Sequence, residues 1–268
     1  MTVSTFLLGF LCLSAALSAI MAVAWLVWRV SRNSGWVDTI WTFGLGLVGL
    51  CSALTVMPMR LQSSLVAAMA AIWALRLGSH IARRTRGITD DPRYAKLIRD
   101  WGPDASRQMF WLLQKQAIVS VPLALSMWLA ANGPSSMAQS VVAMLIFGVA
   151  VAGEGIADEQ LRRFRHESAN KGSVCDVGLW RWSRHPNYFF EWVGWLAYPV
   201  LAIDFTGHNL WGYVALIAPL CMYWLLVYIS GVPPLEEHML ANRGDAFRKY
   251  QMTTNVFFPG PPKVSAGG

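Results

Sequence analysis

The chain has 268 residues, of which 55% are hydrophobic and 14% are charged, and its formal net charge is +7. Soluble domains carry about 25% charged residues, so this composition excludes an ordinary soluble domain. The positive charge does not call for a nucleic-acid partner, because Lys and Arg retained on one side of a membrane explain it.

Apolar segments long enough to cross a bilayer recur along the whole chain. A helix needs about 20 residues to cross roughly 30 Å of hydrocarbon. Seven segments are candidates: residues 6–30, 36–56, 64–82, 110–131, 137–157, 188–203 and 209–230. Their apolar residues are continuous rather than alternating, which argues against the strands of a membrane barrel. The sequence therefore predicts an all-α integral membrane protein with seven transmembrane helices.

The first segment has no Lys or Arg ahead of it and is longer than a signal-peptide core, so we expect a retained helix. Nineteen of the 22 Lys and Arg residues fall on one side of a seven-helix path. That side is cytoplasmic by the positive-inside rule. We therefore expect the N-terminus outside and the C-terminus in the cytoplasm, followed by an amphipathic C-terminal segment.

The second segment contains a glycine pattern that formally matches a dinucleotide-binding fingerprint. Gly44, Gly46 and Gly49 spell GLGLVG. The fingerprint works only after a strand and at the start of a soluble helix. Inside a membrane span, close helix packing through small residues is the better interpretation.

Ionisable residues inside spans cost free energy and tend to mark function. Asp38 lies at the start of the second segment, and Arg76 and His80 share one face of the third. Each has a structural alternative: Asp38 would neutralise Arg32, Arg76 would pair with an acid, and His80 would pack as a satisfied histidine.

The i, i+4 spacing of Arg76 and His80 recurs among polar residues at the cytoplasmic ends of the fifth and sixth segments. Glu154 and Asp158 are spaced i, i+4, and the alternative is an interface role with Arg162. The sixth segment continues the spacing and starts at Pro186, a residue suited to the first turn of a helix. Its three polar or aromatic positions are Asn187, Glu191 and Trp195.

Arg184 and His185 stand just before the sixth segment. A helix N-terminus attracts anions, so we expect a phosphate-bearing cofactor here, with Asn187 and Glu191 binding its uncharged head. No CxxC pair or histidine at metal spacing accompanies the four cysteines, so we predict neither a disulfide nor a metal. No linker divides the chain, so we expect one domain over residues 1–268, with the cofactor part at about 153–259 and a disordered tail at 260–268.

The stretch KGSVCDVGLWRWSRHPNYFFEW, with the later Phe-Phe-Pro at residues 257–259, resembles the bacterial, DUF1295-type branch of the steroid 5α-reductase superfamily. This resemblance implies a seven-helix enzyme of the bacterial inner membrane that uses NADPH to reduce an activated carbon–carbon double bond of a lipid or steroid-like substrate. It implies that Asn187, Tyr188 and Glu191 hold the nicotinamide amide and that Asp158 lies near the adenosine. The weaker correspondences are Trp195, Arg84, Lys171 and Arg243.

The sequence departs from the family pattern where the proton donor is expected. Ile81 stands at the position of the catalytic tyrosine, and the second segment has no Gln-Glu pair. Asp38 and His80 are the available substitutes, with Tyr94 ranked behind them. The departure leaves the substrate open among fatty-acyl, isoprenoid and sterol-like lipids. We expect no partner other than this lipid-like substrate and the surrounding membrane lipids, and the sequence gives no oligomeric state.

A second enzyme class shares part of the pattern. Membrane methyltransferases related to isoprenylcysteine carboxyl methyltransferase carry a similar Arg-His-Pro-x-Tyr motif and a later Glu-Glu pair, which residues 184–188 and 236–237 match. That resemblance implies S-adenosylmethionine in the same pocket. A non-enzymatic lipid carrier or scaffold is a third possibility, but it would not need its polar residues gathered on one side.

Overall fold

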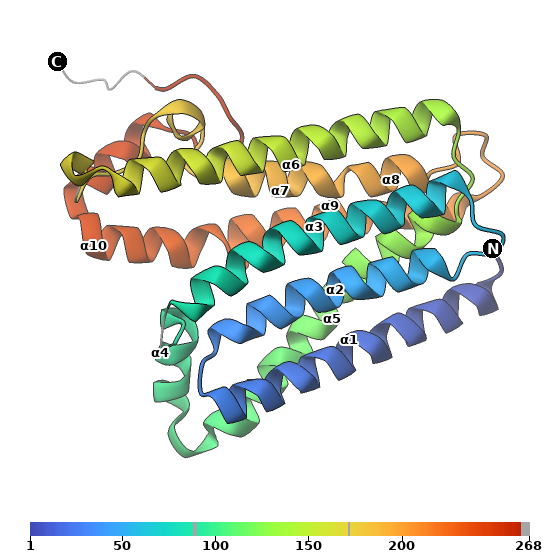
Figure 1. Ribbon diagram of the computed structural model, residues 1–268, viewed down its shortest axis with the longest axis horizontal. Helices are drawn as coiled ribbons and strands as arrows, with labels where there is room; N and C mark the ends of the chain where they lie inside the picture. Colours follow the sequence, from blue (N-terminus) through green and yellow to red (C-terminus); the bar gives the residue numbers. More distant parts are fainter. Residues whose placement is uncertain (88–89, 171, 264–268) are drawn as a thin grey trace. The chain divides into compact units, whose positions relative to one another are not determined.

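A computed structural model describes residues 1–87, 90–170 and 172–263, and the regular structure of these residues is helical (Figure 1). The α-helices are α1 (Val3–Ser31), α2 (Gly35–Leu54), α3 (Leu61–Arg86), α4 (Pro92–Trp101), α5 (Ala105–Asn132), α6 (Met137–His166), α7 (Pro186–Trp195), α8 (Ala197–Ala202), α9 (Ile217–Trp224) and α10 (Val232–Thr253). The 3-10 segments are η1 (Gly102–Asp104), η2 (Ser168–Asn170), η3 (Gly178–Arg181) and η4 (Leu210–Leu216), and η5 (Leu225–Ile229) is a π-helix.

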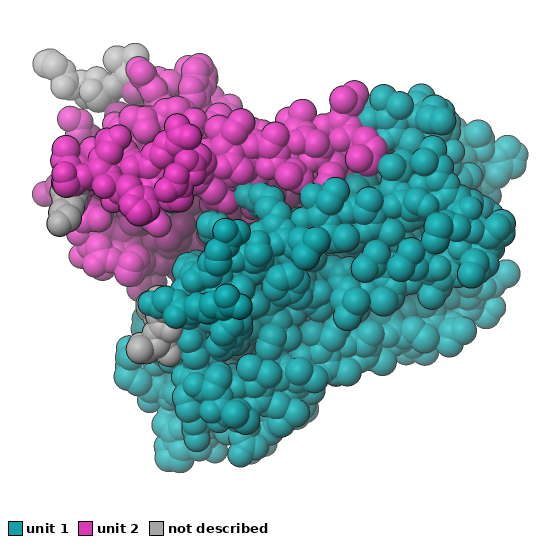
Figure 2. Space-filling model, in the orientation of Figure 1, with its two compact units in different colours: residues 1–142, 198–218 teal, residues 143–197, 219–268 magenta. Residues whose placement is uncertain are grey.

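The chain forms two compact units, coloured separately in Figure 2. The first unit comprises residues 1–142 and 198–218, and the second comprises residues 143–197 and 219–268. We describe each unit by itself. The prediction of one domain over the whole chain stays a prediction.

In the described residues, six helical stretches are long and apolar enough to cross a membrane. Long apolar side chains such as Leu8, Leu11 and Leu145 are more than half exposed, as expected for surfaces that face lipid. The segment predicted as the sixth span is divided into α7 and α8, of 10 and 6 residues, with Leu196 between them. The all-helical membrane fold is confirmed, while the count of seven spans stays a prediction.

In the first unit, α2 lies between α1 and α3, and α5 packs against all three (Figure 1). Small residues allow this close approach. A Cβ at Gly46 would collide with the Ala74 side chain of α3, and one at Gly49 would collide with Met127 of α5. The glycines of GLGLVG therefore serve helix packing, as the sequence predicts.

Two glutamines bind backbone carbonyls around the end of α8 in this unit. Gln139 Nε2 donates to the Val200 and Ile203 carbonyls, each at 2.8 Å. Gln62 Nε2 donates to the Leu201 carbonyl at 2.9 Å and also to that of Ala130. Carbonyls at a helix end lack partners within the helix, so these side chains satisfy groups that lipid could not.

In the second unit, α6 and α7 approach closely through one glycine. A Cβ at Gly153 would collide with the Phe190 ring of α7. The loop between the helices folds back on α6, where Trp180 Nε1 donates to the Ala157 carbonyl at 2.9 Å and Gln160 Oε1 accepts from Leu179 N at 2.9 Å. These contacts fix the start of α7 against the polar end of α6.

Candidate functional site

The second unit gathers polar side chains around the turn that precedes α7. Pro186 occupies the first helical turn, and its ring disfavours the α conformation for the residue before it, so the helix begins abruptly after His185. Ser183, Arg184 and His185 are all buried, with exposed fractions of 0%, 8% and 3%. Such burial of polar groups requires a hydrogen-bond partner for nearly every donor.

Glu236 of α10 supplies the charged partner of Arg184 and His185. Its carboxylate accepts from Arg184 Nε at 2.7 Å, from His185 Nε2 at 2.9 Å and from Gln251 Nε2 at 2.6 Å. Arg184 Nη2 adds a longer contact at 3.3 Å. Breaking these contacts would leave a buried carboxylate without compensation for its charge, which is strongly destabilising. The contacts therefore hold Arg184, His185 and Gln251 in place around Glu236.

The end of the chain completes the turn. We call residues 254–263 the C-terminal strap. The Arg184 backbone N–H donates to the Asn255 carbonyl at 2.8 Å, and its Nη1 donates to the Thr254 carbonyl at 2.7 Å. Ser183 Oγ donates to the Phe257 carbonyl at 2.8 Å, and the Gly260 N–H donates to the Trp182 carbonyl at 3.0 Å. The Arg184 guanidinium therefore already binds the Glu236 carboxylate through Nε and the Thr254 carbonyl of the strap through Nη1.

One buried atom in this cluster has no partner among the described residues, namely Nδ1 of His185. The imidazole ring stacks on the Tyr188 ring, with centroids 5.4 Å apart and planes 7° apart. Burial lowers the pKa of His185, and the hydrogen bond and charge of Glu236 offset that effect only in part. The ring is thus neutral at pH 7.

Asp158 and Asn187 meet where α6 faces α7. Asn187 Nδ2 donates to Asp158 Oδ1 at 3.3 Å, and Asn187 Oδ1 accepts from the Tyr188 N–H at 3.0 Å. One turn further along α7, the Glu191 carboxylate is 9% exposed and accepts from Trp195 Nε1 at 2.9 Å. The i, i+4 spacing thus places an amide, a carboxylate and an indole in one row.

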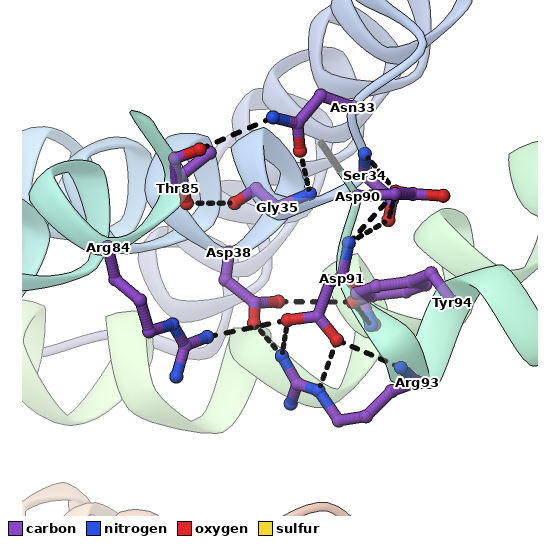
Figure 3. Close-up of polar contacts among 11 residues, drawn as sticks. Asn33, Ser34, Gly35, Asp38, Arg84, Thr85, Asp90, Asp91, Arg93 and Tyr94 are labelled. Carbon is purple, nitrogen blue, oxygen red and sulfur yellow. Dashed lines mark hydrogen bonds and ion pairs between the residues drawn. The ribbon is translucent and has the colours of Figure 1, made fainter. Parts of the chain in front are cut away.

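The first unit holds a second polar cluster, at the start of α2 (Figure 3). Asp38 forms an ion pair with Arg93 of α4 and accepts from the Tyr94 hydroxyl at 3.1 Å. Gln116 of α5 donates to the same hydroxyl at 3.0 Å. Tyr94 is 6% exposed, so Asp38 anchors α4 through a buried hydroxyl and a guanidinium.

Asp91 caps α4 beside this pair. Its Oδ1 accepts from the Arg93 N–H at 3.0 Å and from Arg93 Nε at 3.0 Å, and its Oδ2 accepts from Arg84 at 3.4 Å. Burial alone would raise the pKa of Asp91, but the hydrogen bonds and charge of Arg93, aided by Arg84, hold it below its ordinary value. Asp91 is therefore ionised at neutral pH, and the contacts of the cluster fasten α4 to α2 and α3.

Three further residues predicted from the sequence lie apart from these contacts. His80 of α3 is exposed and makes no hydrogen bond or ion pair in the part of the chain that the structure describes, and none joins it to Asp38. Arg84, predicted to bind the cofactor, pairs with Asp91 of its own unit and is 54% exposed. Arg243 of α10 is exposed, and Lys171 lies outside the described residues. The roles assigned to these residues stay predictions.

Sequence reasoning noted Glu236 only as part of the Glu-Glu pair at 236–237, and it missed the contacts by which Glu236 and three other residues hold the site residues in place. Glu236, which also binds Gln251, holds His185 in the turn before α7. Arg93, which Asp91 holds, binds Asp38 in the second cluster. Glu236 had a signal, because a Glu-Glu pair at the start of an amphipathic segment is typical of one of the two resembling families. The sequence contains no comparable signal for the contact between α4 and α2, because no spacing rule connects the two helices.

Comparison with known proteins yields one match. A family model described as "Protein of unknown function (DUF1295)" matches residues 24–254, which include both polar clusters. No curated protein and no solved structure matches the chain.

Proposed function

The chain belongs to the DUF1295 family, and from this premise we propose that it is a membrane enzyme that uses NADPH to reduce an activated carbon–carbon double bond of a lipid-like substrate. One observation carries the proposal. Asn187 and Asp158 meet across α6 and α7, and the buried Glu191 lies one turn along the same row. Such a row is costly in an apolar helix pair unless it serves a polar ligand.

The chemistry of the row fits the cofactor. A carboxamide both donates and accepts hydrogen bonds, and the Glu191 carboxylate and the Asn187 amide offer both kinds of partner. Asp158 would accept from a ribose hydroxyl or an adenine amine. The unpartnered Nδ1 of His185 is a further buried polar atom for which a ligand would provide the missing contact. Tyr188 and Trp195 would border the same row with aromatic surface, and Arg243 and Lys171 would serve the phosphates.

Bound NADPH would supply the hydride for the reduction. The chain itself must supply a proton for the oxygen on which negative charge develops. Asp38 and His80 remain the proposed donors. Replacing either residue by Ala should leave NADPH affinity unchanged and lower turnover by about a hundredfold or more, in line with the usual contribution of general acid catalysis.

A second function is favoured by a separate observation. Glu236 contacts both Arg184 and His185, so the two motifs that resemble membrane methyltransferases meet in one cluster. In that alternative the same pocket would bind S-adenosylmethionine and no hydride would move. We favour the reductase because the resemblance to the steroid 5α-reductase superfamily implies a cofactor-binding role for Asp158, Asn187 and Glu191.

Thermal unfolding of the purified protein in detergent distinguishes the two functions. A ligand that binds only the folded protein stabilises it by about 2.7 kcal/mol at one hundred times its Kd. We expect NADPH to raise the unfolding temperature and S-adenosylmethionine to leave it unchanged. Stabilisation by S-adenosylmethionine alone would overturn the reductase proposal, and stabilisation by neither would argue for a carrier or scaffold.

Neighbouring carboxylates on α6 offer a matched pair of variants. We expect Asp158→Asn to weaken NADPH binding about tenfold, because the Asn187 amide and the ligand lose a charged acceptor. Glu159→Gln is the control, since Glu159 pairs with Arg162 and Arg163 on an exposed surface. Equal affinity of the two variants and the wild type would remove Asp158 from the site.

A further inference from the structure

We infer that His185 recognises the cofactor as a hydrogen-bond acceptor, through Nδ1, and that Glu236 is the positioning residue that holds the ring in that state. The inference rests on the proposed function, because it concerns the same cofactor site. From charge alone, Arg184 and His185 before α7 would be two cations that attract a phosphate. In this inference His185 is instead a neutral hydrogen-bond acceptor.

The tautomer follows from what Glu236 can do. An ionised carboxylate only accepts hydrogen bonds, and the ion pair with Arg184 at 2.7 Å keeps Glu236 ionised. His185 Nε2 lies 2.9 Å from the same carboxylate oxygen, so Nε2 must carry the proton. In a neutral imidazole the other nitrogen then has a lone pair and no proton.

Burial of the ring, which is 3% exposed, lowers the pKa of His185 more than the hydrogen bond and charge of Glu236 raise it, and the positive charge of Arg184 lowers it further, so the ring stays neutral. A neutral ring cannot serve as the cation of an anion site. Arg184 cannot serve easily either, since Glu236 and the carbonyls of Thr254 and Gln251 already occupy its donors. Of the groups in this turn, Nδ1 of His185 is therefore the one that we assign to the cofactor, and it acts as an acceptor.

The lone pair on Nδ1 is buried and has no partner in the described residues. A buried acceptor without a donor is rare in folded proteins and marks a missing ligand or water. The pyrophosphate bridge of a dinucleotide has no proton to offer it at neutral pH. A ribose hydroxyl or an amide N–H does, and His185 comes two residues before Asn187, at the point where α7 begins. The group recognised is therefore an uncharged donor of the cofactor, of the kind that its sugar provides.

Two substitutions of the same residue separate this role from a structural one. The amide nitrogen of Gln reaches the position of Nε2, so His185→Gln keeps the contact with Glu236 and loses the acceptor at Nδ1. The amide of Asn reaches the position of Nδ1, so His185→Asn keeps an acceptor there and loses the contact with Glu236. We expect His185→Gln to retain the unfolding temperature and to bind NADPH about tenfold more weakly. We expect His185→Asn to lower the unfolding temperature and to keep most of the affinity.

The opposite pattern, in which affinity follows only the contact with Glu236, would overturn the inference. Nitrogen-15 NMR of the histidines gives a readout that does not depend on the variants. The wild-type protein should show His185 unprotonated at Nδ1, with a resonance that shifts when NADPH is added and does not shift with sulfate, an anion that has no proton to donate at pH 7. A doubly protonated His185 at pH 7, or an unshifted resonance in protein saturated with NADPH, would also refute it.

Failure of the proposed function has a different signature. If the wild type binds S-adenosylmethionine and not NADPH, the reductase is refuted, and the same two variants decide the inference with S-adenosylmethionine, which also carries ribose hydroxyls. If NADPH binds the wild type and His185→Gln equally well, the inference is refuted and the reductase stands.

Discussion

At the scale of single residues, the buried charges of Arg184 and Glu236 are committed to each other and to neighbouring groups. Arg184 and Glu236 have exposed fractions of 8% and 13% and bind each other, a histidine, a glutamine and backbone carbonyls. Sequence spacing predicted that Asp158 and Asn187 belong to one site, because each is a polar position near the end of an apolar segment. It could not predict that Arg184 would be occupied, since its partner lies 52 residues away and no local pattern connects them.

Asp91 gives a prediction at this scale. Asp91→Asn should lower the stability of the protein at pH 7 by about 1–3 kcal/mol, because Arg93 and Arg84 lose a charged acceptor. The pKa of Asp91 is lowered on folding, so its contribution is complete above the ordinary carboxyl value of about 4 and is lost as the pH falls through the folded value. Unfolding temperatures measured between pH 7 and pH 3 should therefore converge for the wild type and the variant.

Asp245→Asn is the control for this comparison. Asp245 forms an ion pair with Arg248 three residues on, but its side chain is 96% exposed. Exposed pairs contribute little, so this variant should unfold like the wild type at every pH. A constant difference between Asp91→Asn and the wild type down to pH 3 would show that the charge of Asp91 does not matter.

At the scale of elements, the long apolar helices follow from composition, and the short ones do not. α1, α2, α3, α5 and α6 fall where continuous apolar residues predict them. The division of the sixth predicted span into α7 and α8 was missed, although Pro199 is a signal for it. A proline inside a helix donates no backbone hydrogen bond, and its ring clashes with the carbonyl four residues earlier, here that of Trp195, the last residue of α7. α4 lies in the connection between the third and fourth predicted spans, and ion pairs of Arg93 fix its place.

The approach of α6 to α7 gives a prediction at this scale. Gly153→Ala should disturb the contact between Asp158 and Asn187, because the added methyl collides with the Phe190 ring and forces the helices apart. We expect a loss of stability of about 1–3 kcal/mol, typical of an overpacked interior, and weaker cofactor binding. Calorimetric titration with NADPH and thermal unfolding measure the two effects.

Gly155 lies two residues further along α6 and has open space around its Cα. Gly155→Ala should therefore bind NADPH like the wild type, and it should be as stable or slightly more so, since Ala favours the helix. The idea of a close α6–α7 contact fails if Gly153→Ala behaves like this control.

At the scale of the whole molecule, the family and the fold class were accessible from the sequence, and both are confirmed. The stretch from Lys171 to Trp192 was sufficient to identify the family, and the family model matches residues 24–254. The identity of the lipid was not accessible, because an apolar pocket is specified by shape and spacing does not encode shape. The orientation in the membrane rests on the distribution of Lys and Arg and stays a prediction.

Labelling of single cysteines tests that orientation. In a background without Cys12, Cys51, Cys175 and Cys221, Met59→Cys and Asp245→Cys place thiols at positions that are 55% and 96% exposed. A maleimide that cannot cross the membrane should label the first in intact cells and the second only after permeabilisation, because positive charge is retained in the cytoplasm. The reverse pattern would invert the topology.

The C-terminal strap also bears on how the protein is made. The carbonyls that hold Ser183 and Arg184 belong to residues 254–257, which follow the apolar helices from α1 to α9 in the chain. These helices can therefore enter the bilayer before the turn at α7 acquires its final form. Synthesis itself delays the completion of that turn, so a chain terminated before residue 254 would be anchored in the membrane and still lack these contacts.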